Sequence, residues 1–161
     1  MTATEFLELY ARYCSTEEAR VHSTRYALIG HLLRRAWCRE TAHPDSQATW
    51  SETNPALGQC AVSALVVYDL LGGAITRCTV DGFGSHYANL VNLGEMHLRV
   101  DLTLSQFPSG TRMHEGSVVS SDHLLHSSRA ILAGTPERYV MLRERVAQVV
   151  RNVIDEEHCD G

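Results

Sequence analysis

Lysine does not occur in this chain of 161 residues, and all fourteen basic residues are arginines. Schiff-base catalysis by a lysine side chain is therefore excluded. The sequence also lacks a CxxC pair, because its five cysteines are widely spaced, at Cys14, Cys38, Cys60, Cys78 and Cys159. An odd number at such spacing disfavours both a disulfide framework and a zinc site. A covalent nucleophile would have to be something other than lysine.

Long apolar runs, low-complexity tracts and blocks of like charge are missing as well. No apolar run approaches the length of a membrane span, and the opening MTATEFLELYARYC lacks a basic leader and an uninterrupted apolar core. The formal charge is −5 and the arginines are dispersed, whereas a nucleic-acid partner would need a clustered basic face. We therefore expect a cytoplasmic protein with no nucleic-acid or membrane partner. The sequence leaves its oligomeric state open.

The composition is that of an ordinary globular protein, with 44% hydrophobic and 20% charged residues. A chain of this length can bury one substantial core, so we expect residues 1–161 to form a single domain. Helical periodicity toward both ends and strand-like alternation between them predict an α+β fold.

The segment from Asn54 to Gly73, NPALGQCAVSALVVYDLLGG, is predicted to be the central helix. After Gln59 it is apolar nearly all round, as expected inside a domain, and paired glycines commonly end a helix. Cys60 falls in the first turn, where the helix dipole and unpaired backbone N–H groups favour a nucleophilic thiolate. The alternative is a structural cysteine, which behaves as a small buried hydrophobic residue.

Further helices are predicted on both sides of this segment, over residues 2–13, 23–38, 120–134 and from 135 onward. The first has Thr2 and Glu5 in capping-box spacing, and the last opens with Thr135 and Pro136, an N-cap followed by proline. A polar loop precedes the central helix and contains Trp50. Trp50 is expected either to form one wall of a site or merely to cover the core.

Strands are predicted after the central helix, over residues 75–80, 85–91 and 96–102. The last two are expected to form a hairpin. If Leu93 and Gly94 are its two-residue loop, His86 lies opposite Asp101 across the ladder. Cross-strand partners project from the same face, close enough for a carboxylate to hold an imidazole. A three-residue loop would shift this register.

Cysteine catalysis needs a thiolate, a base within reach, and a third group that orients the base. Cys60, His86 and Asp101 supply these three in sequence order. Acyl transfer also needs donors at the developing oxyanion, and the candidates are the backbone N–H of Cys60 and the side chains of Gln59 and Asn54.

A metal site is a weaker possibility. Asp122 and His123 are followed by His126, and two imidazoles three residues apart on a helix can share a metal, but no further ligand follows at a convincing spacing. The alternative is that these are solvated or core-edge histidines. We therefore expect neither a metal nor a cofactor.

Several segments make the chain resemble the YunG family of small bacterial proteins, namely NPALGQCAVSALVVYDLLGG, GSHYANLV, VDLTLSQF, RRAWCRETAH and PERYVMLRERV. The resemblance runs from about Leu33 to Val146, and its GQCAV and DLT..QF blocks are quite specific. The family in turn resembles the papain-like and transglutaminase-like group, in which a cysteine-bearing helix packs on an antiparallel sheet that supplies His and then Asp or Asn. The resemblance thus implies a papain-like core, with Cys60, His86 and Asp101 at the matching positions.

Two departures from the family pattern lie beside the expected site. The family often carries an aromatic residue where this chain has Ala88, and its hairpin between the His and the Asp is usually shorter than the one from His86 to Asp101. Both departures suggest an altered pocket or substrate.

The expected function is acyl transfer through a thioester on Cys60, with a small-molecule or peptide acyl substrate. Release of the acyl group to water would make the protein an amidase or peptidase, and release to an amine would make it an amide-forming acyltransferase. The alternative is a non-catalytic protein that uses a papain-like cleft, or the arginine-rich second helix, to bind a partner.

Overall fold

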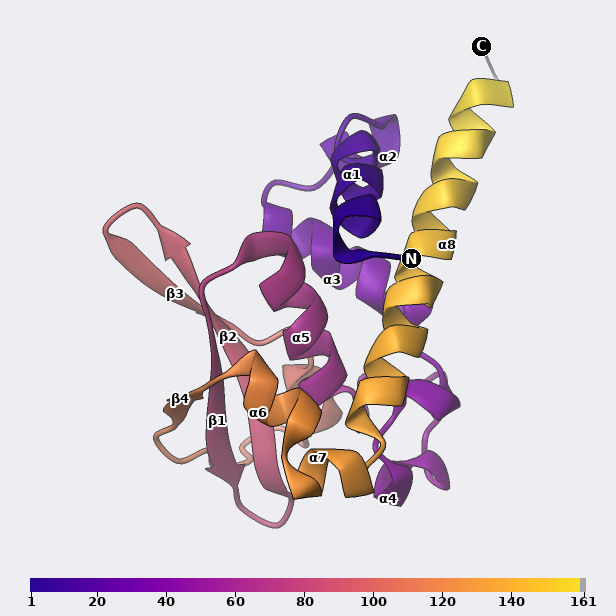
Figure 1. Ribbon diagram of the computed structural model, residues 1–161. Helices are drawn as coiled ribbons and strands as arrows, with labels where there is room; N and C mark the ends of the chain where they lie inside the picture. The colour runs from indigo at the N-terminus through magenta and orange to yellow at the C-terminus, as the bar shows by residue number, and fades with distance from the viewer. Residues whose placement is uncertain (160–161) are drawn as a thin grey trace.

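A mixed α+β architecture is seen in the computed structural model, which describes residues 1–159 except for the side chain of Leu93. Four antiparallel strands form one sheet in the order β3-β2-β1-β4. The helices α5 and α6 lie against this sheet, and the other long helices pack beyond α5 (Figure 1). The predicted fold class is confirmed at this level.

The sheet is built around a long central pair of strands. The strands span β1 (Ala74–Val80), β2 (Gly84–Leu93), β3 (Met96–Val100) and β4 (Ser117–Val119). The sequence predicted the first three but not β4, which pairs with β1 over three residues. Because β3 ends at Val100, opposite Asn89, the first half of β2 has no strand on that side. From the chain that follows Asp101, the Phe107 ring packs on His86 in this half of β2.

The central helix α5 (Cys60–Leu71) begins at Cys60 and ends at Gly72, where φ is 68°. Its buried residues include Val62 and Leu65, and it packs against β2 on one side and against α8 on the other. A nearly all-round apolar helix is stable only when neighbours cover most of its surface. The sequence prediction of a central helix opening on Cys60 is confirmed.

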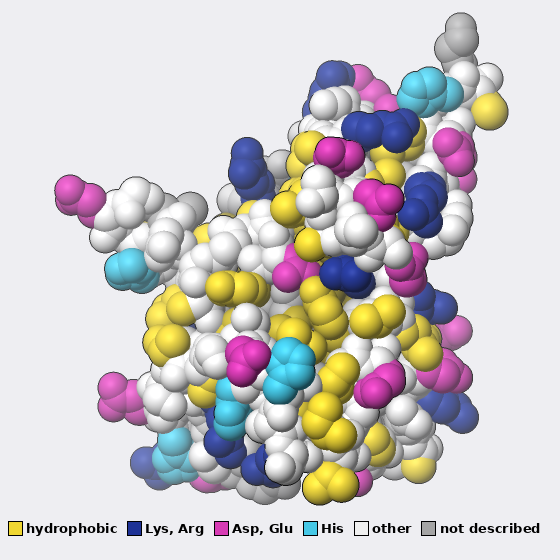
Figure 2. Space-filling view, viewed as in Figure 1, with side chains coloured by type: hydrophobic (Ala, Val, Ile, Leu, Met, Phe, Trp, Pro, Cys, Tyr) yellow, Lys and Arg dark blue, Asp and Glu magenta, His cyan; other side chains and the backbone are white. Residues whose placement is uncertain are grey.

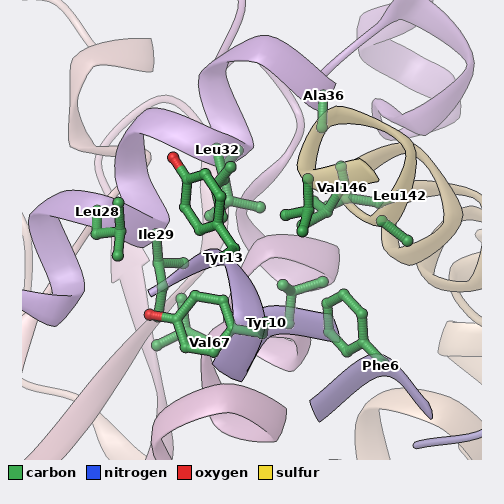
Figure 3. Packing of buried hydrophobic residues seen from close by; sticks show 14 of the residues in the cluster. Phe6, Tyr10, Tyr13, Leu28, Ile29, Leu32, Ala36, Val67, Leu142 and Val146 are labelled. Carbon is green, nitrogen blue, oxygen red and sulfur yellow. The ribbon is translucent and has the colours of Figure 1, made fainter. Parts of the chain in front are cut away.

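Three further helices complete the main hydrophobic core: α1 (Ala3–Tyr13), α3 (Arg25–Ala36) and α8 (Thr135–Cys159). Helix α1 begins with the predicted capping box between Thr2 and Glu5. Figure 3 shows the packing of side chains from these helices and α5, among them Phe6, Tyr10, Tyr13, Leu28, Ile29, Leu32, Ala36, Val67, Leu142 and Val146. Burial of such side chains is the main stabilising contribution to the fold.

Short helical segments connect the long elements: α2 (Glu17–Arg20), η1 (Arg39–Thr41), α4 (Pro44–Gln47), η2 (Leu104–Gln106), α6 (Ser121–His126) and α7 (Ser128–Leu132). A single helix was expected over 120–134, but the chain breaks at Ser127 into α6 and α7. Ser127 adopts extended backbone angles, and its side chain accepts a hydrogen bond from the N–H of Ala130. A serine that caps a new helix competes with continuation of the old one.

The β2–β3 hairpin projects from the body of the molecule (Figure 1). Figure 2 shows polar, acidic and histidine side chains on this projection. Within residues 1–159, no helix has the length and apolar character needed to cross a membrane.

Candidate active site

Cys60 stands at the N-terminus of α5, and its side chain is partly accessible. The preceding turn uses Gly58, with φ of 72°, and Gln59, whose backbone already has near-helical angles. Within the described chain, the backbone N–H groups of Cys60 and Ala61 donate no hydrogen bond to the protein. First-turn amides have no intrahelical acceptor and carry the positive end of the helix dipole. The thiol therefore lies beside donors that favour negative charge.

His86 and Asp101 form a buried pair, with 2.7 Å between Nε2 of His86 and Oδ2 of Asp101. The imidazole is fully buried, and the Asp101 side chain is 7% exposed. A carboxylate accepts, so Nε2 carries the proton and Nδ1 is the nitrogen left for another partner. The predicted contact between these two residues is confirmed.

The register that predicted this contact was wrong by two positions. Leu93 pairs with Met96, so Gly94 and Glu95 form the loop, and the ladder continued from its last pair would place Asp101 opposite Ala88. Asp101 therefore reaches His86 diagonally. A shift of two keeps every side chain on its original face, because side chains alternate with a period of two. The side chains of His86 and Asp101 therefore project from the same face of the sheet in either register.

Asp101 and Cys60 both favour the charged form of His86. Burial of the ring opposes its charge, but hydrogen bonding and charge from Asp101 and from Cys60 outweigh burial and raise the pKa of His86 to about 9. Among the described residues, Nδ1 has no well-aligned hydrogen-bond partner. Nδ1 is thus free to accept a partner on the side away from Asp101, and catalytic hydrogen bonds often tighten only around a substrate. An imidazolium beside Cys60 stabilises a thiolate.

Aromatic rings cover the His86–Asp101 pair. The Phe107 ring meets the His86 ring edge-on, with centroids 4.9 Å apart, and the Phe83 ring packs on Phe107 at 5.1 Å. Arg99 approaches Asp101 from the exposed side, with 3.4 Å between Nη2 and Oδ2. These neighbours keep water from the imidazole and hold the carboxylate in place.

A cavity of about 260 Å³ opens beside Cys60. Its walls come from the start of α4, the N-terminus of α5, strands β1 and β2, the segment around Phe107, and α6 to α8. The charged and polar groups in these walls include His43, Asp45, Arg77, Tyr87, Arg129 and Arg138. The cavity is small for a ligand pocket and presents both apolar and cationic surface.

Trp50 and Asn54 do not line this cavity. The Trp50 indole donates to the carbonyl of Pro55 at 3.0 Å and lines a separate groove beside α3. Asn54 makes a tight backbone bridge with Ser51. The polar loop folds back on itself around these contacts, so it is the neighbouring His43 and not Trp50 that reaches the Cys60 cavity.

Gln59 is also directed away from the cavity. Its side chain is buried, and Nε2 donates to the carbonyl of Cys38 at 2.9 Å. Ala88 is buried in the sheet and lies outside the cavity wall. Of the residues predicted for the oxyanion, only Cys60 lines the cavity, and Ala61 beside it lines the cavity as well.

Sequence reasoning missed the cationic part of the cavity. Arg77 and Arg138 lie far from Cys60 in sequence, on β1 and α8, and reach the cavity through the tertiary fold. The alternation of β1 could have placed Arg77 on one face, but no local pattern marks Arg138. Phe107 lies within the recognised VDLTLSQF block, yet its contact with His86 has no local signal.

The two histidines of α6, His123 and His126, have separate surroundings and do not share a site. His126 bonds Asp122, with 2.9 Å between Nδ1 and Oδ1, while His123 lines the Cys60 cavity. Across residues 1–159, no three His, Cys, Asp or Glu side chains are grouped to hold a metal ion.

Replacement of Gly58 by alanine is expected to destabilise the cavity wall. A Cβ at Gly58 would lie 2.7 Å from Cβ of Ser46 and 2.9 Å from the backbone nitrogen of His43, at a φ that disfavours any side chain. We expect a loss of about 2–4 kcal/mol in the free energy of unfolding, from strain and overpacking together. Urea denaturation measures it.

Gly82→Ala is the matched control, because Gly82 has a φ of 79° but no atom within 4 Å of an added Cβ. It should show only the backbone cost, about 1 kcal/mol. Equal losses for the two variants would contradict the close approach of the Gly58 turn to α4.

Comparisons with known proteins identify relatives of the whole site region. The family model described as "YunG protein" matches residues 25–151, which include all the residues around the cavity. The uncharacterised protein YunG of Bacillus subtilis (strain 168) is 30% identical over 129 residues, covering 80% of this chain and 96% of that protein. No solved structure matches the chain.

Proposed function

The chain belongs to the YunG family, and from the buried His86–Asp101 pair and a cavity lined by Cys60 we propose that it is a cysteine enzyme of acyl transfer. The observation that carries the proposal is the buried His86–Asp101 pair next to a partly accessible cysteine on a helix N-terminus. A nucleophile, a base and an orienting group are the parts that such chemistry requires.

In the first half of the reaction, the Cys60 thiolate attacks the carbonyl carbon of an amide, ester or thioester. The new S–C bond forms as the carbonyl π electrons move to oxygen, where the N–H groups of Cys60 and Ala61 stabilise the oxyanion. The intermediate collapses, the bond to the leaving group breaks, and imidazolium His86 gives its proton to that group. The product is a thioester on Cys60 with a neutral His86.

In the second half, water or an amine attacks the thioester. His86 takes the proton of the attacking group, the S–C bond breaks, and Cys60 leaves as a thiolate. Asp101 holds the His86 ring through both proton transfers and favours its charged form. Water would give an amidase or peptidase, whereas an amine would give an amide-forming acyltransferase.

The proposal extends to the fold. A cysteine-bearing helix against an antiparallel sheet that carries a histidine and then an aspartate is the arrangement of the papain-like and transglutaminase-like group. The order Cys60, His86, Asp101 and the packing of α5 on β2 support this core. Fold resemblance alone does not assign an activity, so the catalytic proposal depends on the site geometry.

Selective alkylation tests the nucleophile. We expect iodoacetamide at neutral pH to modify Cys60 at least tenfold faster than the exposed Cys14 or Cys159, since thiolate content sets the rate. Peptide mass mapping at short times identifies the modified residue. A Cys60→Ser control should lose the fast phase only. If Cys60 reacts no faster than Cys14 in the folded protein, the nucleophile proposal fails.

A further inference from the structure

Arg138 is a buried cation whose bonds go only to neutral acceptors. Its side chain is 5% exposed in the first turns of α8. Nε donates to the carbonyl of Ala133 at 3.0 Å, Nη1 to the carbonyl of Thr41 at 3.1 Å, and Nη2 to Oγ1 of Thr135 at 3.2 Å. Buried charges are nearly always paired with an opposite charge, because desolvation is costly. Arg138 therefore lacks the partner that its position calls for.

No protein carboxylate fills that role in the part of the chain that is described. The arginines in ion pairs there are Arg20, Arg35 and Arg99. Burial lowers the pKa of Arg138, while the charges of Cys60 and Glu137 oppose that effect. The guanidinium thus lies within electrostatic reach of the proposed nucleophile.

The cavity shared by Arg138 and Cys60 is cationic in a protein that is acidic overall. Its lining contains three arginines, Arg77, Arg129 and Arg138, against one aspartate. That aspartate, Asp45, has a side chain 92% exposed and lies 3.6 Å from Nδ1 of His43. The formal charge of the whole chain is −5. This local excess of positive charge would attract an anionic ligand.

The donors left on Arg138 indicate which anion fits. A guanidinium has five N–H donors, and three are used by the backbone and by Thr135. One N–H remains on each terminal nitrogen, and two such donors match the two oxygens of a carboxylate. We propose that the acyl substrate of Cys60 carries a carboxylate and that Arg138 binds it in this cavity.

This inference rests on the proposed function, since it names the substrate class for the same site. The carbonyl to be attacked lies at Cys60 and the carboxylate at Arg138, so a single small molecule or acidic peptide end spans the cavity. A volume of about 260 Å³ suits a small acyl group. Arg77 and Arg129 add positive charge to the wall and the mouth, which favours entry of the anion.

Two alkylating agents that differ in charge test the carboxylate site. Iodoacetate carries a carboxylate, and iodoacetamide replaces it with a neutral amide of the same size. For Cys60 of wild-type protein, the ratio of the iodoacetate rate to the iodoacetamide rate should exceed the same ratio for glutathione by about tenfold. This factor corresponds to less free energy than a full charge-assisted hydrogen bond contributes. Arg138→Gln should bring the ratio close to that of glutathione.

Arg143→Gln is the matched control. Arg143 also lies on α8 and also donates to a backbone carbonyl, that of Met1 at 2.8 Å, but it does not line the Cys60 cavity. The ratio should stay at the wild-type value in this variant. Arg138→Lys, which keeps the charge but not the paired donors, should give an intermediate ratio.

A protection experiment on wild-type protein tests the carboxylate site without any substitution. Succinate should slow the modification of Cys60 by iodoacetamide, while succinamide, inorganic phosphate and sodium chloride at equal ionic strength should have a smaller effect. Equal protection by phosphate would show a general anion site and overturn the carboxylate assignment.

The outcomes separate this inference from the proposed function. If Cys60 reacts slowly with both reagents, the proposed nucleophile fails. If Cys60 reacts fast with iodoacetamide but shows no preference for iodoacetate and no protection by succinate, the nucleophile stands and the carboxylate site is wrong. If Arg138→Gln slows both reagents equally, Arg138 acts on the thiolate and not on a substrate carboxylate, which also overturns the inference.

Discussion

Replacement of Cys60 by alanine is expected to abolish the covalent acyl intermediate. With p-nitrophenyl acetate, wild-type protein should gain the mass of one acetyl group, and Cys60→Ala should gain none. Turnover of the ester should fall by roughly a thousandfold or more, as it does when the nucleophile of a catalytic triad is removed. Intact-mass spectrometry and release of p-nitrophenolate measure the two effects.

Cys159→Ala controls for the loss of a thiol as such, because Cys159 is exposed at the end of α8. It should acylate like the wild-type protein. An acetyl group that persists on Cys60→Ala at the wild-type rate would place the nucleophile elsewhere. The same measurement on a panel of carboxylate-bearing esters would report the mass of the preferred acyl group.

Loss of the His86 proton should limit amide cleavage at high pH. The pKa of His86 is about 9, raised against burial by Asp101 and Cys60, so the ring carries its proton below that pH and loses it above. An anilide leaves only with a proton, and its cleavage should fall as pH rises through about 9. A p-nitrophenyl ester needs no proton on its leaving group and should lack this decline.

Two variants test whether His86 is the group whose titration causes the decline at high pH. His86→Gln should lower the rate of anilide cleavage by roughly 10²–10⁴, the usual contribution of a general acid–base residue, and should remove the decline at high pH. Asp101→Asn takes away the charge that favours the imidazolium, so the decline should begin at lower pH. A decline near pH 9 that persists in His86→Gln would contradict the assignment.

The sequence predicted the placement of Cys60, His86 and Asp101 better than the cavity near them. The apolar run after Gln59 marked the central helix, and the period of two in the hairpin placed His86 and Asp101 on one face despite the wrong loop. Both signals come from short stretches of sequence. They reflect which side chains of a helix or strand are buried, and this periodicity does not depend on which neighbour covers them.

Contacts between distant segments were beyond such reasoning. Trp50 had the size and position of a cavity wall, but its indole found a backbone acceptor within its own loop. No local pattern marks Arg138, and its bond to the carbonyl of Thr41, 97 residues away, forms only in the folded chain. A residue whose partners are set by tertiary structure leaves no periodic signal in the sequence.

The bond from Arg138 to the carbonyl of Thr41 has a consequence for how the protein is made. It joins the last helix, whose Arg138 lines the cavity beside Cys60, to a turn that is synthesised much earlier. During vectorial synthesis Cys60 and His86, the proposed nucleophile and base, leave the ribosome first, while Arg138 arrives with α8. Under the proposed assignment, selectivity for a carboxylate is acquired only when α8 packs against the turn at Thr41, so a partly made chain would hold Cys60 without the proposed anion site.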